Sequence, residues 1–385
     1  MTDNSLDDGV PRRRRPRGQA GRRRGRLLAA ASVAVMVVLA AVGCTSDSSD
    51  DEAPQGGSAS GSIALLLPET QTTRYESADR PYFQARIAKI CPDCKVLYSN
   101  ADQDSAVQQN QAEQAMTNGA KVLVLDPVDG EAAAVIARNA RDRGVRVVSY
   151  DRLIQKAPVD AYISFDNEKV GQLQGQSLLD AIGERAGAGK VIMINGSQDD
   201  PNAQQFKDGA LSVLEGKVTI GFDTFTPDWS PDTAGREMDQ AITTVGRENI
   251  VGVYAANDGI AGAVVAALRR ANVTPLPPVT GQDAELAGVQ RVLAGDQHMT
   301  VYKAIRPEAE QAADLALALL RGEPVDTIAT DRVDNGDGQV PSVLLEPVAV
   351  TRDTVAETVV KDGFLAKADL CAGTFAAACA SAGVS

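Results

Sequence analysis

The chain has 385 residues, of which 44% are hydrophobic and only 4% aromatic, enough for two domains with aliphatic cores. The formal net charge is −13, but residues 1–26 hold nine Arg and three Asp. The rest of the chain has 29 basic and 48 acidic residues, a net charge of −19. A body this acidic repels nucleic acid and anionic membrane surfaces, which argues against both as partners.

Residues 1–43 have the layout of an export signal. The Arg-rich start precedes residues 27–42, which are apolar except for one Ser. This run is shorter than the ~20 residues of a spanning helix and is typical of a signal peptide. Arg23-Arg24 leaves both Sec and twin-Arg export open.

The export signal ends at a cysteine. Ala41-Val42-Gly43-Cys44 is similar to a bacterial lipobox, although that motif usually has Leu where Ala41 stands. We therefore expect Cys44 to be lipidated and to anchor the protein outside the cytoplasm. The alternative is an ordinary cleaved signal with an incidental Cys. Residues 44–61 are small and polar, which predicts a flexible tether.

Strand and helix patterns alternate after the tether. Short apolar runs predict strands at residues 63–67, 95–98, 122–125, 145–150, 162–165, 191–194, 218–222, 251–255, 279–280 and 299–302. Helical patterns occupy residues 81–90, 105–118, 130–143, 169–182, 259–271 and 307–321. Most strands are apolar throughout, so helices should cover both faces. The alternation predicts an α/β fold with parallel, doubly wound sheets, and its length predicts two similar lobes that divide near Asp166.

Polar residues follow several predicted strands. Asp, Asn and Arg occur at 150–152, 164–167, 256–258 and 281–284. Ligands bind at the carboxyl ends of strands in open α/β sheets. Each of these residues could simply cap the next helix, but several polar turns at the same sheet ends favour a cleft for a polyhydroxy ligand.

Two further turns strengthen this interpretation. Asp200 and Asn202 follow another predicted strand, and Trp229, the single Trp, lies in a polar, Pro-flanked turn. We expect Trp229 to stack on a ligand ring rather than to belong to the core, because sugar rings expose apolar C–H faces.

Motifs for other chemistry are weak. Residues 183–190 superficially resemble a phosphate loop, but the segment joins a helix to a strand and has Val191 where Ser or Thr should follow. His298 is the only His, which argues against a catalytic triad and His-based acid–base chemistry. We expect no cofactor and no metal.

Four cysteines remain beside Cys44. Cys91 and Cys94 form a C-x-x-C pair, and Cys371 and Cys379 lie near the carboxyl terminus. Outside the cytoplasm, an even count favours disulfides within each pair. A redox pair or a zinc site is the alternative. The C-x-x-C precedes a strand instead of opening a helix, and ligands for zinc are lacking at suitable spacing.

Four runs resemble the D-xylose-binding proteins of bacterial ABC importers. They are residues 150–154 (YDRLI), 162–171 (YISFDNEKVG), 281–288 (GQDAELAG) and 299–303 (MTVYK). The resemblance extends over about residues 63–350. It implies the type I periplasmic-binding-protein fold, in which two Rossmann-like lobes are joined by a three-strand hinge and a sugar is closed between them.

The resemblance also implies the division of the chain. The N-terminal lobe comprises residues 62–165 plus 304–335, the C-terminal lobe 166–303 plus 336–360, and the tail 361–385. The implied sugar-binding residues are Arg74, Tyr75, Asp151, Arg152, Asp200, Asn202, Trp229, Asn257, Asp283 and Lys303. Tyr75 stands where xylose binders usually have Trp.

The expected function is that of a monomeric, extracytoplasmic binding lipoprotein. It would bind a monosaccharide, with D-xylose favoured, and deliver it to an ABC permease of the cytoplasmic membrane. A glucose/galactose or multi-sugar receptor is the nearest alternative. Carboxylates in a sugar cleft also allow a glycosidase, but neighbouring Arg and Lys favour binding over catalysis. A sugar-responsive repressor shares the fold, but the chain has an export signal where a repressor needs a helix-turn-helix.

Overall fold

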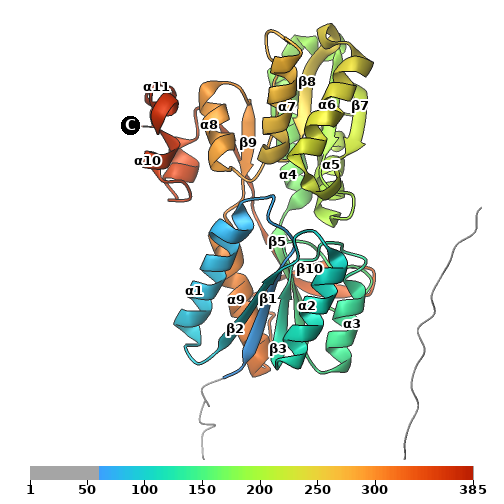
Figure 1. The fold of residues 1–385 in the computed structure, drawn as a ribbon, viewed down its shortest axis with the longest axis vertical. Coiled ribbons are helices and arrows are strands. Elements are labelled where there is room, and N and C mark those ends of the chain that lie inside the picture. The colour runs from blue at the N-terminus through green and yellow to red at the C-terminus, as the bar shows by residue number, and fades with distance from the viewer. Residues whose placement is uncertain (1–59, 385) are drawn as a thin grey trace, which may run out of the picture. The chain divides into compact units, whose positions relative to one another are not determined.

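The computed structural model describes residues 60–384, so Cys44, the expected signal peptide and most of the tether lie outside the described residues. The strands are β1 (Ser62–Leu67), β2 (Lys95–Asn100), β3 (Ala120–Leu125), β4 (Arg146–Tyr150), β5 (Ala161–Phe165), β6 (Lys190–Asn195), β7 (Thr219–Phe225), β8 (Ile250–Ala255), β9 (Met299–Tyr302), β10 (Asp331–Asp334), β11 (Gln339–Leu345) and β12 (Val348–Thr351). The α-helices are α1 (Arg80–Ile90), α2 (Ser105–Thr117), α3 (Ala134–Asp142), α4 (Asn167–Ile182), α5 (Pro201–Leu214), α6 (Pro231–Val245), α7 (Asp258–Arg270), α8 (Leu286–Ala294), α9 (Ile305–Arg321), α10 (Lys367–Leu370) and α11 (Ala376–Ser381). These elements form two α/β lobes (Figure 1).

The first lobe contains a seven-stranded sheet in the order β10-β11-β5-β4-β3-β1-β2. Its strands are parallel except for β10, which pairs antiparallel with β11. In β1, Ile63 and Leu65 face the core under α1 and α9, whereas Ala64 and Leu66 face the core under α2 and α3. Because side chains alternate between the faces of a strand, a continuously apolar run fits a sheet covered on both sides.

The second lobe is built around the parallel sheet β7-β6-β8. Residues 279–280, predicted as a strand, form only an isolated bridge from Val279 to Val253 of β8. The antiparallel pair β9-β12 lies beyond them, and the peptide N–H of Val301 donates to the carbonyl of Gly281. Helices α4–α7 pack with this sheet around a core that includes Ile192, Val253 and Leu268.

The chain crosses between the lobes three times, as expected, but the third crossing lies later than expected. The first two follow β5 and β9, and the third joins β11 to β12. β11 continues the first-lobe sheet through its pairing with β5, so residues 336–345 belong to that lobe. The predicted boundary between residues 335 and 336 is therefore wrong, because the first lobe continues to the end of β11. Asn335-Gly336 lies in the turn of a β10–β11 hairpin, and Asn-Gly is a strong hairpin signal that keeps both strands in one sheet.

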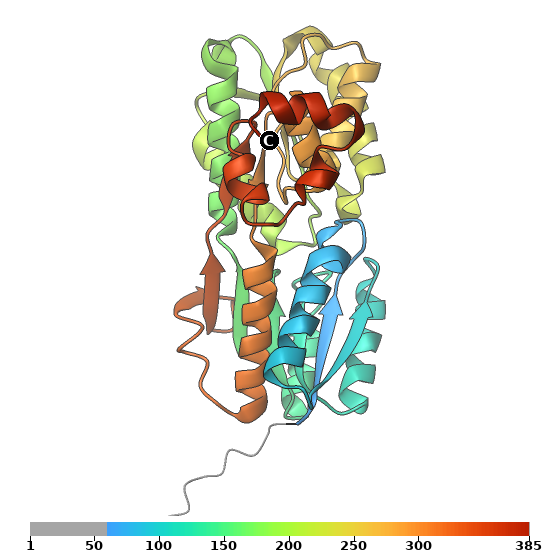
Figure 2. The ribbon, with the colours of Figure 1, turned by 90° about the vertical axis from the view of Figure 1, so that its left-hand side faces the viewer.

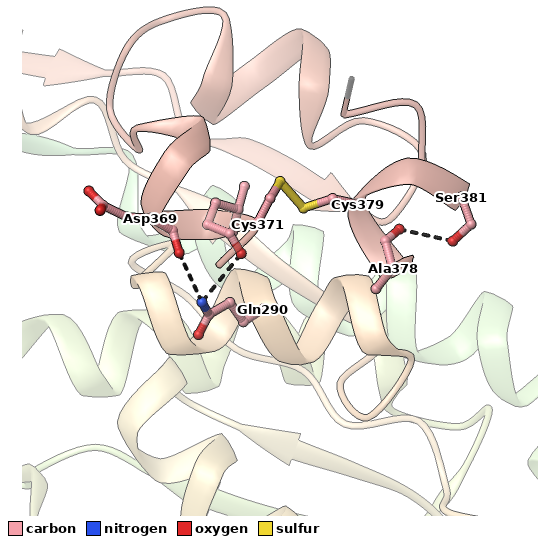
Figure 3. Close-up of a disulfide and its surroundings, with 7 residues drawn as sticks. Gln290, Asp369, Cys371, Ala378, Cys379 and Ser381 are labelled. Atoms are coloured by element: carbon pink, nitrogen blue, oxygen red, sulfur yellow. Dashed lines mark hydrogen bonds between the residues drawn. A yellow bond between two sulfur atoms is a disulfide. The ribbon is translucent and has the colours of Figure 1, made fainter. Parts of the chain in front are cut away.

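The carboxyl-terminal segment packs on the second lobe (Figure 2). A Cys371–Cys379 disulfide joins α10 to α11, and Gln290 of α8 donates to the carbonyls of Asp369 and Leu370 (Figure 3). A second disulfide, Cys91–Cys94, lies between α1 and β2. Across residues 60–384, every helix is too short or too polar to cross a membrane.

Candidate functional site

A cavity between the lobes is lined by side chains that follow strands of both sheets. The lining comprises thirteen residues: Thr72, Arg74, Tyr75, Asp151, Arg152, Asp200, Asn202, Phe206, Trp229, Asn257, Gln282, Asp283 and Lys303. All ten residues proposed from the sequence are among them. Thr72, Phe206 and Gln282 are the additional members. The carboxyl ends of the two sets of strands therefore face one another across the cavity.

Arg74 organises the first-lobe side. Its guanidinium contacts three carboxylates at 2.5–2.6 Å: Asp79, Asp151 and Glu308. The Arg74 side chain is only 3% exposed, so these charge-assisted contacts form away from water. Burial alone would raise the pKa of Asp151, but the charges of Arg74, Lys303 and Arg152 bring it below its usual value. Asp151 is therefore an ionised acceptor at neutral pH.

Arg152 connects the lobes. Its Nε lies 2.8 Å from Oδ2 of Asp200 in the second lobe and 3.6 Å from Oδ1 of Asp126 in its own lobe. The amide of Asn202 donates to Asp151 Oδ1 at 2.6 Å, which is a second side-chain bridge between the lobes. Both bridges join residues that line the cavity.

Helix capping and cavity lining are combined in two residues. Asp200 accepts the peptide N–H of Asn202 through Oδ1 and contacts Arg152 through Oδ2. Asn257 accepts the peptide N–H of Ile260 at the start of α7 and also lines the cavity. A polar residue that follows a strand can therefore cap the next helix and line the ligand cavity at the same time.

Trp229 differs from its expected setting. It lines the cavity but also belongs to the second-lobe core, where its ring meets Phe206 edge-on with centroids 6.4 Å apart. Its Nε1 donates to Asp200 Oδ2 at 3.1 Å. A side chain at Gly196 would collide with this ring, since a Cβ there would lie 2.1 Å from it. The expectation that Trp229 is not a core residue is wrong, because its side chain is buried among second-lobe core residues and its indole N–H donates to a buried acceptor.

Asp283 is deeply placed. The residue is only 4% exposed. Its carboxylate lies 2.9 Å from Lys303 Nζ. Burial lowers the pKa of Lys303, and the charges of Asp283 and Asp151 outweigh that effect and raise it. Asp283 and Lys303 thus form a buried ion pair in the second-lobe wall.

Three carboxylates near the cavity were missed by sequence reasoning. Asp126 is fully buried, and neither of its side-chain oxygens has a hydrogen-bond donor among residues 60–384. Burial raises the pKa of Asp126, although Arg152 opposes the shift. Asp126 follows β3 as Asp151 follows β4, so its strand-end position could have identified it. Asp79 and Glu308 belong to helical segments and carry no such signal.

Other candidate chemistry finds no support in the described part of the chain. Residues 183–190 continue from α4 into a short 3₁₀ turn before β6, as expected for a helix-to-strand connection. His298 lies away from the cavity, beside residues 276–278. Residues 60–384 contain no group of His, Cys, Asp or Glu arranged to hold a metal ion.

The two-lobed fold and its interlobe cavity define a ligand-binding protein. Residues 63–324 match the family model described as a periplasmic binding protein domain, which is more than half of the chain. The chain belongs to this family, and the expected fold is confirmed. Members of the family are binding proteins and not enzymes, so the glycosidase alternative is set aside.

Three similar proteins illustrate the relationship. The D-xylose-binding periplasmic protein of Escherichia coli (strain K12) is 34% identical over 313 residues, with 80% of this chain and 92% of the relative covered. The multiple sugar-binding periplasmic receptor ChvE of Rhizobium radiobacter is 34% identical over 337 residues, covering 82% and 94%. A carbohydrate transporter solute binding protein from Chloroflexus aurantiacus, solved with D-glucose, has a TM-score of 0.74 and 30% identity, covering 80% and 98%. The resemblance found in the sequence is confirmed.

Proposed function

We propose that this protein is an extracytoplasmic lipoprotein that binds D-xylose between its lobes and delivers it to an ABC permease. The observation that carries the proposal is the cavity itself. It combines the carboxylates of Asp151 and Asp283, the cations Arg152 and Lys303, and the Trp229 ring in one buried space. Charged donors and acceptors suit hydroxyl groups, and an aromatic ring suits the C–H face of a sugar.

The lobes lie close together around the cavity. Its free volume is only about 20 Å³, far below the ~300–1,000 Å³ typical of ligand pockets, so the lobes would have to move apart for a sugar to enter. A monosaccharide needs less additional space than a longer saccharide. D-xylose is favoured because the E. coli relative, similar over most of both chains, is a D-xylose-binding protein. D-glucose is the second candidate, since the Chloroflexus structure contains it.

The side-chain bridges between the lobes indicate how a sugar would be held. Arg152–Asp200 and Asn202–Asp151 join the lobes at the cavity, and a sugar there would contact both sides at once. Three crossing segments connect the lobes, so closure would be a hinge motion around the ligand. The protein would act as a monomer and would bind the sugar without changing it chemically. Opening of the lobes would then release the sugar to the permease.

One calorimetric panel tests the ligand. Purified protein would be titrated with D-xylose, D-glucose, D-galactose, L-arabinose and D-ribose. We expect D-xylose to bind tightest. Tightest binding of D-glucose would support the second candidate, and no binding of any of the five would contradict the function. Incubation with labelled sugars and simple glycosides should return them unchanged.

Lipid anchoring is tested separately. Residues 1–43 and Cys44 support export followed by lipidation, with residues 44–61 as the tether. Cys44→Ala should release the protein from the membrane fraction. Cys371→Ala, which removes a cysteine bonded elsewhere, should leave it there. A Cys44→Ala protein that stays membrane-bound after signal processing would contradict the lipid anchor.

A further inference from the structure

The turn that carries Asp283 has an unusual backbone. Asp283 and Ala284 are consecutive non-glycine residues with positive φ angles of 84° and 49°. Such conformations are unfavourable for residues that carry a side chain, and they persist only where surrounding structure holds them. Gln282 and Asp283 both line the cavity, so the contacts that hold this turn also determine where its side chains lie.

Those contacts converge on one carboxylate, that of Asp258. Its Oδ2 accepts the peptide N–H of Glu285 at 2.9 Å and the hydroxyl of Thr300 at 3.0 Å. The Thr300 oxygen in turn accepts the peptide N–H of Ala284 at 3.2 Å. The peptide N–H of Glu285 is therefore bonded directly to Asp258, and the peptide N–H of Ala284 is linked to Asp258 through the Thr300 hydroxyl.

The opposite oxygen of Asp258 is also held. Gln297 Nε2 donates to Oδ1 at 2.6 Å, and the peptide N–H of Asp258 donates to the carbonyl of Gln282 at 3.0 Å. Asp258 is fully buried. A Cβ at Gly281 or at Gly288 would lie 2.1 Å from one of its carboxylate oxygens. The carboxylate thus occupies a closely fitted position beneath the turn.

A helix cap does not explain this carboxylate. Asp258 is the first residue of α7, but the cap of that helix is Asn257, whose side chain accepts the peptide N–H of Ile260. The Asp258 carboxylate instead contacts Gln297, Thr300 and the turn at residues 284–285. Asp258 is not among the residues that line the cavity.

We propose that Asp258 is a positioning residue for the ligand site, acting through the turn at residues 282–285 on Asp283 and Gln282. The proposal rests on the proposed function, because it assigns Asp258 to the binding of the same sugar. Supporting groups of this kind fix the orientation of the residues that touch a ligand.

The test compares three variants by calorimetry with D-xylose and D-glucose. Asp258→Asn keeps the shape but offers one acceptor oxygen in place of two, and we expect about a tenfold loss of affinity. Gly288→Ala inserts a methyl group against the carboxylate from α8 and should weaken binding several-fold. The control is Asp232→Asn, an exposed acid in the first turn of α6, which should leave affinity unchanged.

A double-mutant cycle separates positioning from general stability. If Asp258 acts through Asp283, Asp258→Asn should weaken binding by less than about twofold in an Asp283→Ala background. An equal loss in both backgrounds would overturn the proposal, as would unchanged affinity in both Asp258→Asn and Gly288→Ala.

Hydrogen exchange provides a readout that needs no sugar. The amides of Ala284 and Glu285 should exchange several-fold faster in Asp258→Asn and at the parental rate in Asp232→Asn. Unchanged exchange at both amides would overturn the proposal. If the parent binds no sugar while these amides respond as expected, the proposed function fails and the structural role of Asp258 stands.

Discussion

In the first lobe, Arg74 and Asp151 are placed by ion pairs between side chains, whereas in the second lobe Asp283 is placed by a backbone turn. Arg74 contacts Asp79, Asp151 and Glu308. The turn at Asp283 is held by peptide N–H groups that lead to one buried acceptor. The first-lobe wall therefore depends on a cluster of paired charges, whereas the second-lobe wall combines the single Asp283–Lys303 ion pair with the conformation of the main chain.

This difference predicts different costs of substitution. Removing one partner from a buried charge cluster leaves the others unpaired and destabilises a protein by ~3–5 kcal/mol. Removing a side chain that lies on a turn and contacts the ligand should affect mainly binding. The net contribution of one hydrogen bond to the stability of the fold is only ~0.5–1.5 kcal/mol. Changes in the first-lobe wall should thus lower stability most, and changes in the second-lobe wall should lower affinity most.

The largest effect should follow Arg74→Met. Three buried carboxylates would lose their shared cation, and the free energy of unfolding should fall by ~3–5 kcal/mol in urea titrations. The control is Arg306→Met, because Arg306 and Glu310 form an i,i+4 pair that is 67% and 34% exposed, and exposed pairs of this kind contribute little to stability. Equal unfolding midpoints for the two variants would contradict the importance of the charge cluster.

Asp283→Ala should weaken D-xylose binding by ~10–100-fold, through the loss of ~1–3 kcal/mol of buried hydrogen bonding. Lys303 would lose its partner in this variant, but the negative charge of Asp151 would still lie nearby. The melting temperature of Asp283→Ala should therefore fall less than that of Arg74→Met. Asp239→Ala removes a 53% exposed partner of Arg270 and is the control for both readouts. If Asp283→Ala retained parental affinity, the assignment of this wall to the sugar would be wrong.

Trp229→Phe tests the aromatic contribution to the second-lobe wall. The ring is retained in part, but the Nε1 donor to Asp200 is lost, so affinity should fall by ~3–10-fold. Because Trp229 is the only Trp, parental fluorescence should respond to sugar.

The control for Trp229→Phe is Tyr254→Phe. Tyr254 is buried in the same core, and its hydroxyl has no hydrogen-bond partner among the described residues. This variant should keep both the affinity and the fluorescence response. A parent whose fluorescence does not change at saturating sugar would argue against contact between Trp229 and the ligand.

The smallest effect should be a pH dependence from the second-lobe turn. Burial and the Asp283 charge raise the pKa of Glu285 to about 7, and burial and Glu285 raise that of Asp258 to about 8. Groups whose pKa is raised by folding bind more protons in the folded state, so stability should decrease as pH rises from 5 to 8.

Glu285→Gln should reduce this pH-dependent loss by on the order of 1 kcal/mol in urea titrations at pH 5 and pH 8. Glu357→Gln, at a side chain that is 78% exposed, should leave the dependence unchanged. A parent as stable at pH 8 as at pH 5 would contradict the prediction.

The sequence predicted most of the strands and the residues that surround the cavity. Apolar runs located β1, β3 and β9 to within two residues, because an element buried on both faces must be apolar along its length. Asp151 and Asn257 were identifiable because they lie within two residues of the ends of such runs, and the carboxyl ends of parallel strands lie at one edge of a sheet. These inferences depend only on residues that are close together in the chain.

Only the tertiary structure decided how those residues are paired and how deeply they lie. Arg74 and Glu308 are 234 positions apart and meet as an ion pair, and Asp283 is buried because β9 and its neighbours enclose its turn. Contacts between distant segments also place β11 in the first-lobe sheet and the carboxylate of Asp258 beneath the strained turn. Local patterns determine which segments are strands and helices, whereas burial and charge pairing depend on contacts between distant segments that exist only once the chain has folded.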